Sequence, residues 1–299
     1  MRQTVCVIGL GSMGYGAAQS LLRAGVTVHG VDVRPEVLER FAKEGGKPFK
    51  SPAEGARDTD AVVTFVVNAE QTEAVLLGAD GAAATMKRDG VVIACATVPP
   101  LFTEALAARI AAAGLEFLDA PVSGGAARAA SGEMTVMASG SAQAFARSET
   151  VLKAIAIKVH RLGDRAGIGS RVKVIHQLLA GVHIAAACEC MALGIKAGID
   201  PKSLYDVITG AAGNSWMFEN RVPHILDGDY TPRSAVDIFV KDLGIVLETG
   251  KALSIDLPVA ATAHQLFKTA SGMGLGREDD SAVVKVYAKQ AGLSLPKGK

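Results

Sequence analysis

Short apolar runs alternate with alanine-rich stretches of helical spacing along the first half of the chain. Each run is rich in Val and Ile and spans only a few residues, which is typical of a buried strand. The expected strands are residues 5–8, 26–31, 61–67, 91–95, 115–118 and 135–138. Because strands that alternate with helices build a largely parallel sheet covered on both faces, the pattern predicts an α/β, doubly wound domain.

The pattern changes to helices alone near residue 165. A long helix rich in Ala, Leu and Ile is expected over roughly residues 170–198, and further helical segments follow without a convincing strand. Glycines cluster at residues 162–169, which is typical of a domain boundary. We therefore expect a first domain over residues 1–164 and an all-helical second domain over residues 165–299.

The expected long helix carries very few charges between Gln177 and Met191. A helix that is apolar on most sides must be buried on most sides, and one small domain cannot easily cover it. We expect a second subunit to cover this helix, so the chain is predicted to form a homodimer or a homotetramer.

The first expected strand leads directly into a glycine-rich turn of the form G-x-G-x-x-G. Its residues are Gly9, Leu10, Gly11, Ser12, Met13 and Gly14. The first glycine permits a tight turn, the second lets the backbone approach a pyrophosphate, and the third lets the helix lie close to the strand. The helix N-terminus then faces the anion with unpaired N–H groups. With strands on both sides, this turn predicts a Rossmann dinucleotide-binding domain rather than an ordinary glycine-rich turn.

Asp32 ends the second strand and favours NAD as the cofactor. A carboxylate at this position accepts hydrogen bonds from the ribose hydroxyls of NAD and repels the 2′-phosphate of NADP. Arg34 lies two residues further on and could pair with a phosphate, so the strictness of the preference stays open.

Composition excludes several partners. The chain has 31 Lys and Arg against 30 Asp and Glu, so we expect no attraction to nucleic acid or to a membrane surface. Four cysteines without paired spacing indicate small buried side chains in a reducing compartment and argue against a metal site. No uninterrupted apolar stretch reaches the ~18 residues of a membrane span, and the first strand leaves no room for a signal peptide. We expect a cytoplasmic protein.

Two segments could carry chemistry. Residues 119–125, Asp-Ala-Pro-Val-Ser-Gly-Gly, follow an expected strand, and their N–H groups can converge with the Ser123 hydroxyl on a carboxylate or phosphate. Lys173 lies near the start of the long helix among apolar residues, where desolvation lowers a lysine pKa toward the range useful for general acid/base catalysis. His176 and Gln177 follow one turn later, and His176 competes for the role of base because its ordinary pKa is about 6.5.

Taken together, these segments resemble the β-hydroxyacid dehydrogenase family, which includes 3-hydroxyisobutyrate dehydrogenase, tartronate semialdehyde reductase and, more distantly, 6-phosphogluconate dehydrogenase. The resemblance covers nearly the whole chain through four motifs, at residues 9–14, 119–132, 163–177 and 241–243. It implies a Rossmann domain followed by a helical domain that dimerises through its long helix. The implied activity is the NAD-dependent oxidation of a hydroxy acid.

The resemblance also implies roles for single residues. Lys173 is implied to be the general acid/base. The residues implied to bind the substrate carboxylate are Ser123, Gly124 and Gly125, and those implied to complete the nicotinamide site are Thr97 and Lys241.

Three departures from the family pattern fall among the site residues. Many members have Met-Leu-Pro where this chain has Val66-Val67-Asn68, Ser-Thr where it has Ala96-Thr97, and Asn where it has His176. The scaffold motifs are intact, so we expect the reaction type to be retained while the substrate differs.

His176 and residues 211–220 resemble the subgroup that oxidises four-carbon sugar acids. An additional substrate hydroxyl needs a hydrogen-bond partner, which His176, Asn214 or Ser215 could supply, with Gln177 beside them as a further substrate-binding candidate. In the alternative interpretation Asn214 caps a helix and Trp216 packs at the domain interface. 3-Hydroxyisobutyrate and tartronate semialdehyde stay open as substrates, and a catalytically silent NAD-binding interaction module is an alternative of a different class.

Overall fold

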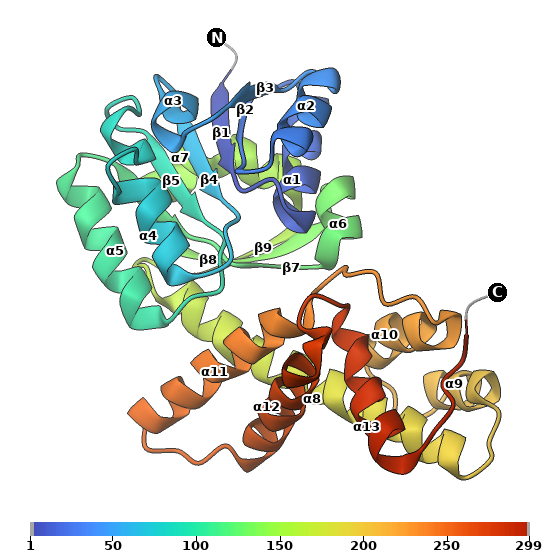
Figure 1. Cartoon of the computed structure of the whole chain (residues 1–299). Coiled ribbons are helices and arrows are strands. Elements are labelled where there is room, and N and C mark those ends of the chain that lie inside the picture. Colours follow the sequence, from blue (N-terminus) through green and yellow to red (C-terminus); the bar gives the residue numbers. More distant parts are fainter. Residues whose placement is uncertain (1–2, 298–299) are drawn as a thin grey trace. The chain divides into compact units, whose positions relative to one another are not determined.

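The computed structural model describes residues 3–297 and divides into two compact units (Figure 1). Unit 1 extends to Lys173 and contains the sheet, whereas unit 2 extends from Val174 and is helical. The sequence pattern places a boundary between residues 164 and 165, and the structure divides the chain after Lys173, within the long helix. The reason is that the first turn of this helix packs on the sheet of unit 1.

Unit 1 alternates strands and helices as expected for a doubly wound fold. Its strands are β1 (Thr4–Ile8), β2 (Thr27–Val31), β3 (Lys47–Phe49), β4 (Ala61–Thr64), β5 (Val91–Ala94), β6 (Glu116–Asp119), β7 (Val122–Ser123), β8 (Met134–Gly140) and β9 (Ala156–Gly163). Its helices are α1 (Ser12–Arg23), α2 (Pro35–Lys43), α3 (Pro52–Ala56), α4 (Ala69–Leu77), the short 3₁₀ helix η1 (Ala82–Ala84), α5 (Pro100–Ala112), α6 (Gly125–Ser131) and α7 (Ala142–Ile155).

Within residues 3–297, nine strands form one sheet in the order β3-β2-β1-β4-β5-β6-β8-β7, with β9 beside β8. Strands β3 to β6 are parallel, and β8 runs antiparallel to β6 and β7. The order 3-2-1-4-5-6 is that of the Rossmann fold, whose ligands bind at the carboxyl ends of the strands where the order reverses. In this sheet the reversal lies between β1 and β4.

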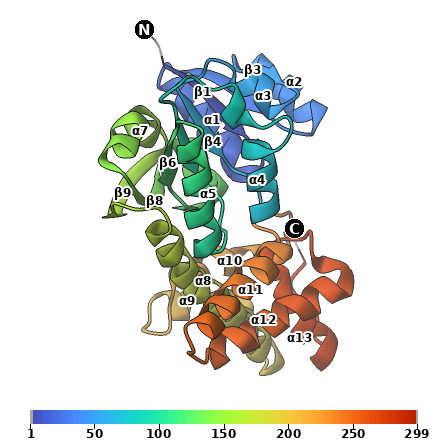
Figure 2. The same ribbon diagram turned by 90° about the vertical axis from the view of Figure 1, so that its left-hand side faces the viewer.

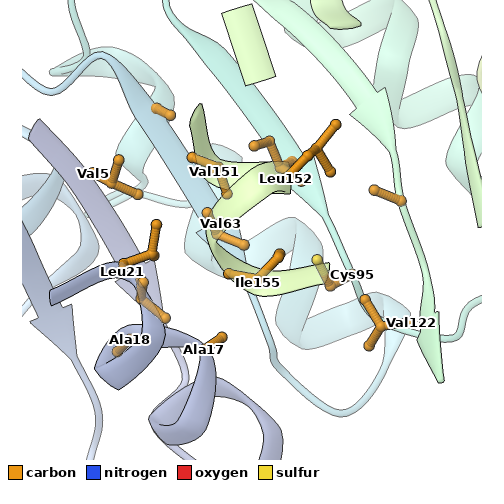
Figure 3. Packing of buried hydrophobic residues seen from close by; sticks show 14 of the residues in the cluster. Val5, Ala17, Ala18, Leu21, Val63, Cys95, Val122, Val151, Leu152 and Ile155 are labelled. Carbon is orange, nitrogen blue, oxygen red and sulfur yellow. The ribbon is translucent and has the colours of Figure 1, made fainter. Parts of the chain in front are cut away.

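Side chains of the central strands alternate between apolar cores on the two faces of the sheet. Val5 of β1 belongs to the core that α1 and α7 cover, together with Leu21 and Ile155, whereas Cys6 belongs to the core that α3, α4 and α5 cover. Figure 3 shows the first of these cores, where Ala17 and other small side chains of α1 bring the helix close to the sheet. Both faces are therefore covered, as parallel sheets require.

All six strands expected from the apolar runs are present, and the sequence pattern missed the other three. β3 and β7 are very short, and β9 is an edge strand whose residues are mostly exposed or only partly buried. The apolar signal of a strand comes from its burial, so a short or exposed edge strand carries little of it.

Unit 2 is built of helices around one apolar core (Figures 1 and 2). Its helices are α8 (Ile168–Lys196, which begins in unit 1), α9 (Pro201–Thr209), α10 (Trp216–Asp227), α11 (Val236–Ala252), α12 (Pro258–Ala270), the π-helical segment η2 (Ser271–Leu275), the 3₁₀ helix η3 (Asp280–Val283) and α13 (Val284–Ala291). Ile184 and Met191 of α8 are fully buried against Val222, Leu243 and Phe267, so α8 is the central helix of this unit.

The long helix expected over residues 170–198 is α8, which lies two residues earlier at each end. Among the helices within residues 3–297, α8 alone has the length and composition to cross a membrane, with a mean hydropathy of 1.8 over 18 residues. Half of that window is buried inside the protein, as in the core helix of a folded domain. Ile175, Leu179 and Leu193 of the same helix are exposed in the single chain.

Candidate active site

The glycine-rich turn joins β1 to α1 with the geometry that a dinucleotide requires. Gly9 has a φ of +91°, and its N–H donates to the Val31 carbonyl oxygen at 2.8 Å. A Cβ on Gly14 would lie 1.9 Å from the Gly9 carbonyl oxygen, so only glycine lets α1 approach β1 this closely. A Cβ on Gly11 would meet no atom of residues 3–297 within 4 Å. The space beside Gly11 therefore fits a ligand in close contact with the backbone.

The N-terminus of α1 fits the pyrophosphate of the dinucleotide. Gly11 is the N-cap of α1, and neither a side-chain cap nor an acidic residue is found in the first turn, which includes Ser12 and Met13. The N–H groups of a first turn without a side-chain cap can bind an anion, and the helix dipole favours negative charge there. Residues 9–14 would thus hold the phosphates of NAD.

Asp32 directly follows β2, where its carboxylate is nearly buried. Its Oδ2 accepts from the Leu10 N–H at 2.8 Å, and its Oδ1 accepts from Arg34 Nε at 2.9 Å and from the Arg34 N–H at 3.0 Å. Burial alone would raise the pKa of Asp32, but the hydrogen bonds from Arg34 and Leu10 outweigh it and lower the pKa. Asp32 is an anion at neutral pH, as the recognition of ribose hydroxyls requires.

The chain turns sharply at residues 119–125, from β6 through β7 into α6. Ser123 pairs with Thr135 of β8, and Gly124 and Gly125 both take positive φ, at +136° and +73°. Other residues would be strained at such angles, so the two glycines permit the turn. α6 begins at Gly125 without a side-chain cap. The Ser123 hydroxyl and the N–H groups of this turn are therefore of the kind that binds a carboxylate.

Thr97 and Lys173 complete the predicted site residues of unit 1. Thr97 follows β5, and Gly9 and Asp32 follow β1 and β2, so these three lie at the carboxyl edge of one parallel sheet. Lys173 is the last residue of unit 1 and is 6% exposed. A buried lysine is unusual and marks a candidate for proton transfer.

Unit 2 contains a hydrogen-bond network around Asp242, a residue to which the sequence analysis gave no role. Gln177 Nε2 donates to one carboxylate oxygen of Asp242, Lys241 Nζ donates to the other, and His176 Nδ1 lies 2.9 Å from Gln177 Oε1. Asp242 and Gln177 are 2% and 7% exposed. A buried carboxylate is costly unless it is paired, so Asp242 fixes the positions of Gln177 and Lys241. The sequence feature that could have indicated Asp242 is an acid beside Lys241 in an otherwise apolar stretch.

Asn214 lies in the turn between α9 and α10 and bonds within this region. Its Nδ2 donates to the Glu219 carboxylate at 2.6 Å and to the Thr209 carbonyl oxygen at 3.2 Å. Asn214 is not the N-cap of α10, because that position is Ser215, whose hydroxyl accepts from the Phe218 N–H at 3.1 Å. The bond to Thr209 instead places the Asn214 amide at the last residue of α9, so the alternative interpretation of Asn214 as a helix cap stays open.

Trp216 is half exposed on unit 2 and lines an open hollow of about 340 Å³ together with Tyr205, Glu219 and two further residues. The hollow does not include His176 or the other members of the Asp242 network. The structure thus groups His176, Gln177 and Lys241 and places Asn214 in a separate turn of the same unit.

Asn68 explains how the fold accommodates one departure from the family pattern. Its Oδ1 accepts from the Gln71 N–H at 2.8 Å, and Gln71 Oε1 accepts from the Val67 N–H at 2.9 Å. This reciprocal arrangement is similar to a capping box, except that Gln71 bonds the N–H of the residue before the N-cap, and it satisfies N–H groups at the start of α4. The helix therefore begins correctly although Val66-Val67-Asn68 replaces Met-Leu-Pro.

Two family models together match most of the chain. The NAD binding domain of 6-phosphogluconate dehydrogenase matches residues 4–163, and the model described as NAD-binding of NADP-dependent 3-hydroxyisobutyrate dehydrogenase matches residues 167–287. L-Threonate dehydrogenase of Cupriavidus necator is 64% identical over 296 residues, which cover 99% of each chain. 2-(Hydroxymethyl)glutarate dehydrogenase of Eubacterium barkeri is 35% identical, with 97% of each chain covered. A crystal structure of 3-hydroxyisobutyrate dehydrogenase from Salmonella typhimurium is 55% identical with a TM-score of 0.91, and covers 95% of this chain and 99% of that one.

The Rossmann sheet, the glycine-rich turn and the helical second unit define an NAD-dependent dehydrogenase. The chain belongs to the family of hydroxyacid dehydrogenases that includes 6-phosphogluconate dehydrogenase and 3-hydroxyisobutyrate dehydrogenase, and it is an NAD-dependent hydroxyacid dehydrogenase.

Proposed function

We propose that this enzyme oxidises L-threonate to a 2-oxo-tetronate, with Lys173 as the general acid/base. When bound, NAD supplies the acceptor for the hydride that leaves the substrate carbon. Lys173 Nζ takes the proton of the hydroxyl that is oxidised, and returns it in the reverse reaction. Ser123, Gly124 and Gly125 bind the carboxylate of the substrate, and Thr97 and Lys241 contribute to the nicotinamide site.

The substrate proposal is supported by relatives that cover the whole chain. L-Threonate dehydrogenases of Cupriavidus necator and of Pectobacterium atrosepticum are 64% and 52% identical to it over 296 residues. The structure with a TM-score of 0.91 bears the name of 3-hydroxyisobutyrate dehydrogenase, which keeps this methyl-bearing acid as the second candidate.

The observation that supports threonate over the methyl-bearing acid is the network of His176 with Gln177 and Asp242. Asp242 holds the Gln177 amide, and His176 Nδ1 contacts the amide oxygen, so the polar edge of His176 is oriented before any substrate binds. A hydroxyl of a four-carbon sugar acid can use such a group. A methyl group cannot, and a site arranged to bond a hydroxyl discriminates against an acid that lacks it.

The proposal is tested by NADH formation with threonate, erythronate, glycerate, tartrate and 3-hydroxyisobutyrate. We expect threonate to be preferred, with kcat/KM for 3-hydroxyisobutyrate lower by about 10⁴. His176→Asn should reduce turnover of threonate more than that of glycerate, because only the longer acid needs the additional partner. Lys173→Met is the inactive reference, and its kcat should fall by roughly 10²–10⁴ with little change in NAD affinity.

Activity on 3-hydroxyisobutyrate without activity on threonate would overturn the substrate and leave the dehydrogenase intact. Normal turnover of Lys173→Met, with His176→Ala inactive, would transfer the role of base to His176. NAD binding without NADH formation from any acid would favour the catalytically silent module.

We also infer that the enzyme is a cytoplasmic homodimer or homotetramer whose subunits meet along α8. Ile175, Leu179 and Leu193 are 65%, 53% and 70% exposed, and their spacing of 4 and 14 residues keeps them on one stripe of the helix. Full burial of a side chain of this size contributes about 1.5–3 kcal/mol, and the exposed part of each contributes its share when a second copy of the chain covers it.

A further inference from the structure

We propose that Asp119 is a positioning residue, which holds the first turn of α8 on the sheet of unit 1 and thereby orients Lys173. The inference rests on the proposed role of Lys173 as the general acid/base. Asp119 ends β6, lies in the same unit as Lys173 and is 1% exposed.

The carboxylate of Asp119 caps α8 from outside the helix. Its Oδ2 accepts from the N–H groups of Gly167 and Ser170 at 2.9 and 2.8 Å, and its Oδ1 accepts from the Ser170 hydroxyl at 2.8 Å. The first N–H groups of a helix have no partner within it, and a side chain of the preceding residue normally supplies one. Gly167 has no side chain, so a strand residue 48 positions away provides the cap.

Ser139 adds a second contact from the neighbouring strand. Asp119 of β6 and Ser139 of β8 are partners in the antiparallel register. Ser139 Oγ donates to Asp119 Oδ2 at 3.2 Å and accepts from the Gly169 N–H at 2.9 Å. Three N–H groups of one helical turn, those of Gly167, Gly169 and Ser170, are therefore bound by two side chains of the sheet.

The first turn of α8 lies against the sheet without free space. A Cβ on Gly169 would lie 2.3 Å from the Met137 carbonyl oxygen and 3.0 Å from that of Asp119. Thr103 of α5 contacts the Ser170 hydroxyl at 3.0 Å from another side. The turn thus has one position on the sheet, and Asp119 is the group that makes most of its polar contacts.

Lys173 follows Ser170 by three residues, which is less than one turn and about 4.5 Å along the helix axis. The direction in which the Lys173 side chain leaves the helix is therefore set by the turn that Asp119 holds. Catalytic geometry is sensitive to small displacements, and a shift of ~1 Å can cost about 10² in rate.

The charge of Asp119 has a second effect on the same lysine. Burial raises the pKa of Asp119, while the hydrogen bonds from Ser170, Gly167 and Ser139 oppose that rise. Every hydrogen bond described above has the carboxylate as acceptor, which is the arrangement of the anion. An anion at this position favours the protonated form of a nearby amine.

The other ionisable groups near this turn are paired or neutral. Asp164 and Arg165, just before it, are exposed and form an ion pair at 3.9 Å. Arg171 of α8 and Glu104 of α5 form an ion pair with opposite charges that offset each other. Cys95 follows β5, and burial, together with the charge of Asp119, raises its pKa, so the thiol is neutral. Asp119 is thus the unbalanced charge among these groups of unit 1.

Two variants separate position from charge. Asp119→Asn keeps the shape, and its amide oxygen can still accept from the N–H groups, so it removes mainly the charge. We expect the acid limb of the pH profile of kcat to move to lower pH by about half a unit or more. Asp119→Ala removes the cap, and kcat should fall about 10–100-fold while KM for the hydroxy acid and the Kd for NAD stay within about threefold.

The matched control is Asp60→Asn, because Asp60 also bonds a distant backbone N–H, that of Thr4 at 2.8 Å, and an ion-pair partner, Lys87 at 2.6 Å. It should alter Tm without moving the pH profile.

If Lys173→Met is inactive but Asp119→Asn keeps the wild-type kcat and acid limb, the inference is wrong and the proposed function stands. Normal turnover of Lys173→Met refutes the proposed function instead. If Asp119→Ala does not fold, the pH profile of Asp119→Asn tests the inference. A kcat that falls only in proportion to the loss of folded enzyme also contradicts the inference.

Discussion

Asp32 and Arg34 form the pair on which the choice of dinucleotide depends. Both oxygens of Asp32 accept from Arg34, and Arg34 Nη2 also donates to the Leu10 carbonyl oxygen at 3.1 Å. In this arrangement the guanidinium is engaged by the acid, and the acid keeps its negative charge at the ribose position. While Arg34 is paired with Asp32, it is therefore not available to bind the 2′-phosphate of NADP, and the pair favours NAD.

We expect kcat/KM to favour NAD over NADP by at least tenfold, or about 1.4 kcal/mol. Asp32→Ala should narrow the gap, because it removes a ribose acceptor and releases Arg34 to pair with the 2′-phosphate. The measurement is kcat/KM for both dinucleotides in the wild type, Asp32→Ala and the double variant that adds Arg34→Ala. Equal use of NAD and NADP by the wild type would contradict the role given to Asp32.

The residues that could be predicted from the sequence are those whose constraint is local. Gly9 and Gly14 were predicted because the glycine-rich turn is a local motif, in which Gly9 takes a positive φ and a Cβ on Gly14 would collide with the Gly9 carbonyl oxygen. The role of Asp119 and that of Asp242 could not be predicted, because each bonds a partner more than 40 residues away. A residue type indicates that a buried acid needs a partner, but the fold decides which one.

Among the elements, α8 depends most on a single small residue. Gly169→Ala would place a methyl group 2.3 Å from the Met137 carbonyl oxygen, so either the helix or β8 must move. Strain of this kind in a packed site costs about 1–3 kcal/mol, and we expect that loss in the free energy of unfolding by urea.

Gly272→Ala is the control for this substitution, because a Cβ there would meet no atom of residues 3–297 within 4 Å. Its effect should stay within about 0.5 kcal/mol. Equal effects of the two substitutions would show that the first turn of α8 can shift on the sheet at little cost.

The elements themselves could be predicted where burial gives them a pattern. The six central strands and α8 have such a pattern, and their positions agree with the sequence to within a few residues. The edge strand β9 and the cap of α4 by Asn68 and Gln71 do not, because an exposed strand lacks apolar alternation and a cap made of hydrogen bonds has no apolar pattern.

The stability of the whole molecule depends on pH through a buried ion pair in unit 2. Arg221 Nε donates to Asp280 Oδ1 at 2.6 Å, and both side chains are almost completely buried. Burial raises the pKa of Asp280 to about 6, against the opposing effect of Arg221. The folded protein therefore binds a proton at Asp280 that the unfolded chain releases above pH ~4.

This proton uptake stabilises the folded protein at low pH. Stability from proton uptake by Asp280 is fully present below pH ~4 and is lost as the pH rises through about 6. Asp280→Asn removes that titration, so the wild type should lose unfolding free energy relative to this variant between pH 4 and 6. Urea unfolding across that range measures it, with the exposed Asp206→Asn as the control. A difference between wild type and Asp280→Asn that does not change with pH would contradict the assignment.

The division of the molecule into a sheet unit and a helical unit could be predicted, because the apolar pattern itself changes near residue 165. The family models change between residues 163 and 167, where the pattern changes, but the division of the compact units after Lys173 could not be predicted. It depends on how many residues of α8 are bound by Asp119 and Ser139, and these contacts join distant parts of the chain.

The division after Lys173 has a consequence for how such an enzyme diversifies. Lys173 and Ser123 belong to the sheet unit, and under the proposed roles they act on the two groups that every hydroxy acid has, its hydroxyl and its carboxylate. His176 and Gln177 belong to the helical unit, and under the same proposed roles they act on what distinguishes one acid from another. Mutations that change the preferred substrate can therefore accumulate around His176 and Gln177 while the residues that act on the hydroxyl and the carboxylate stay under purifying selection.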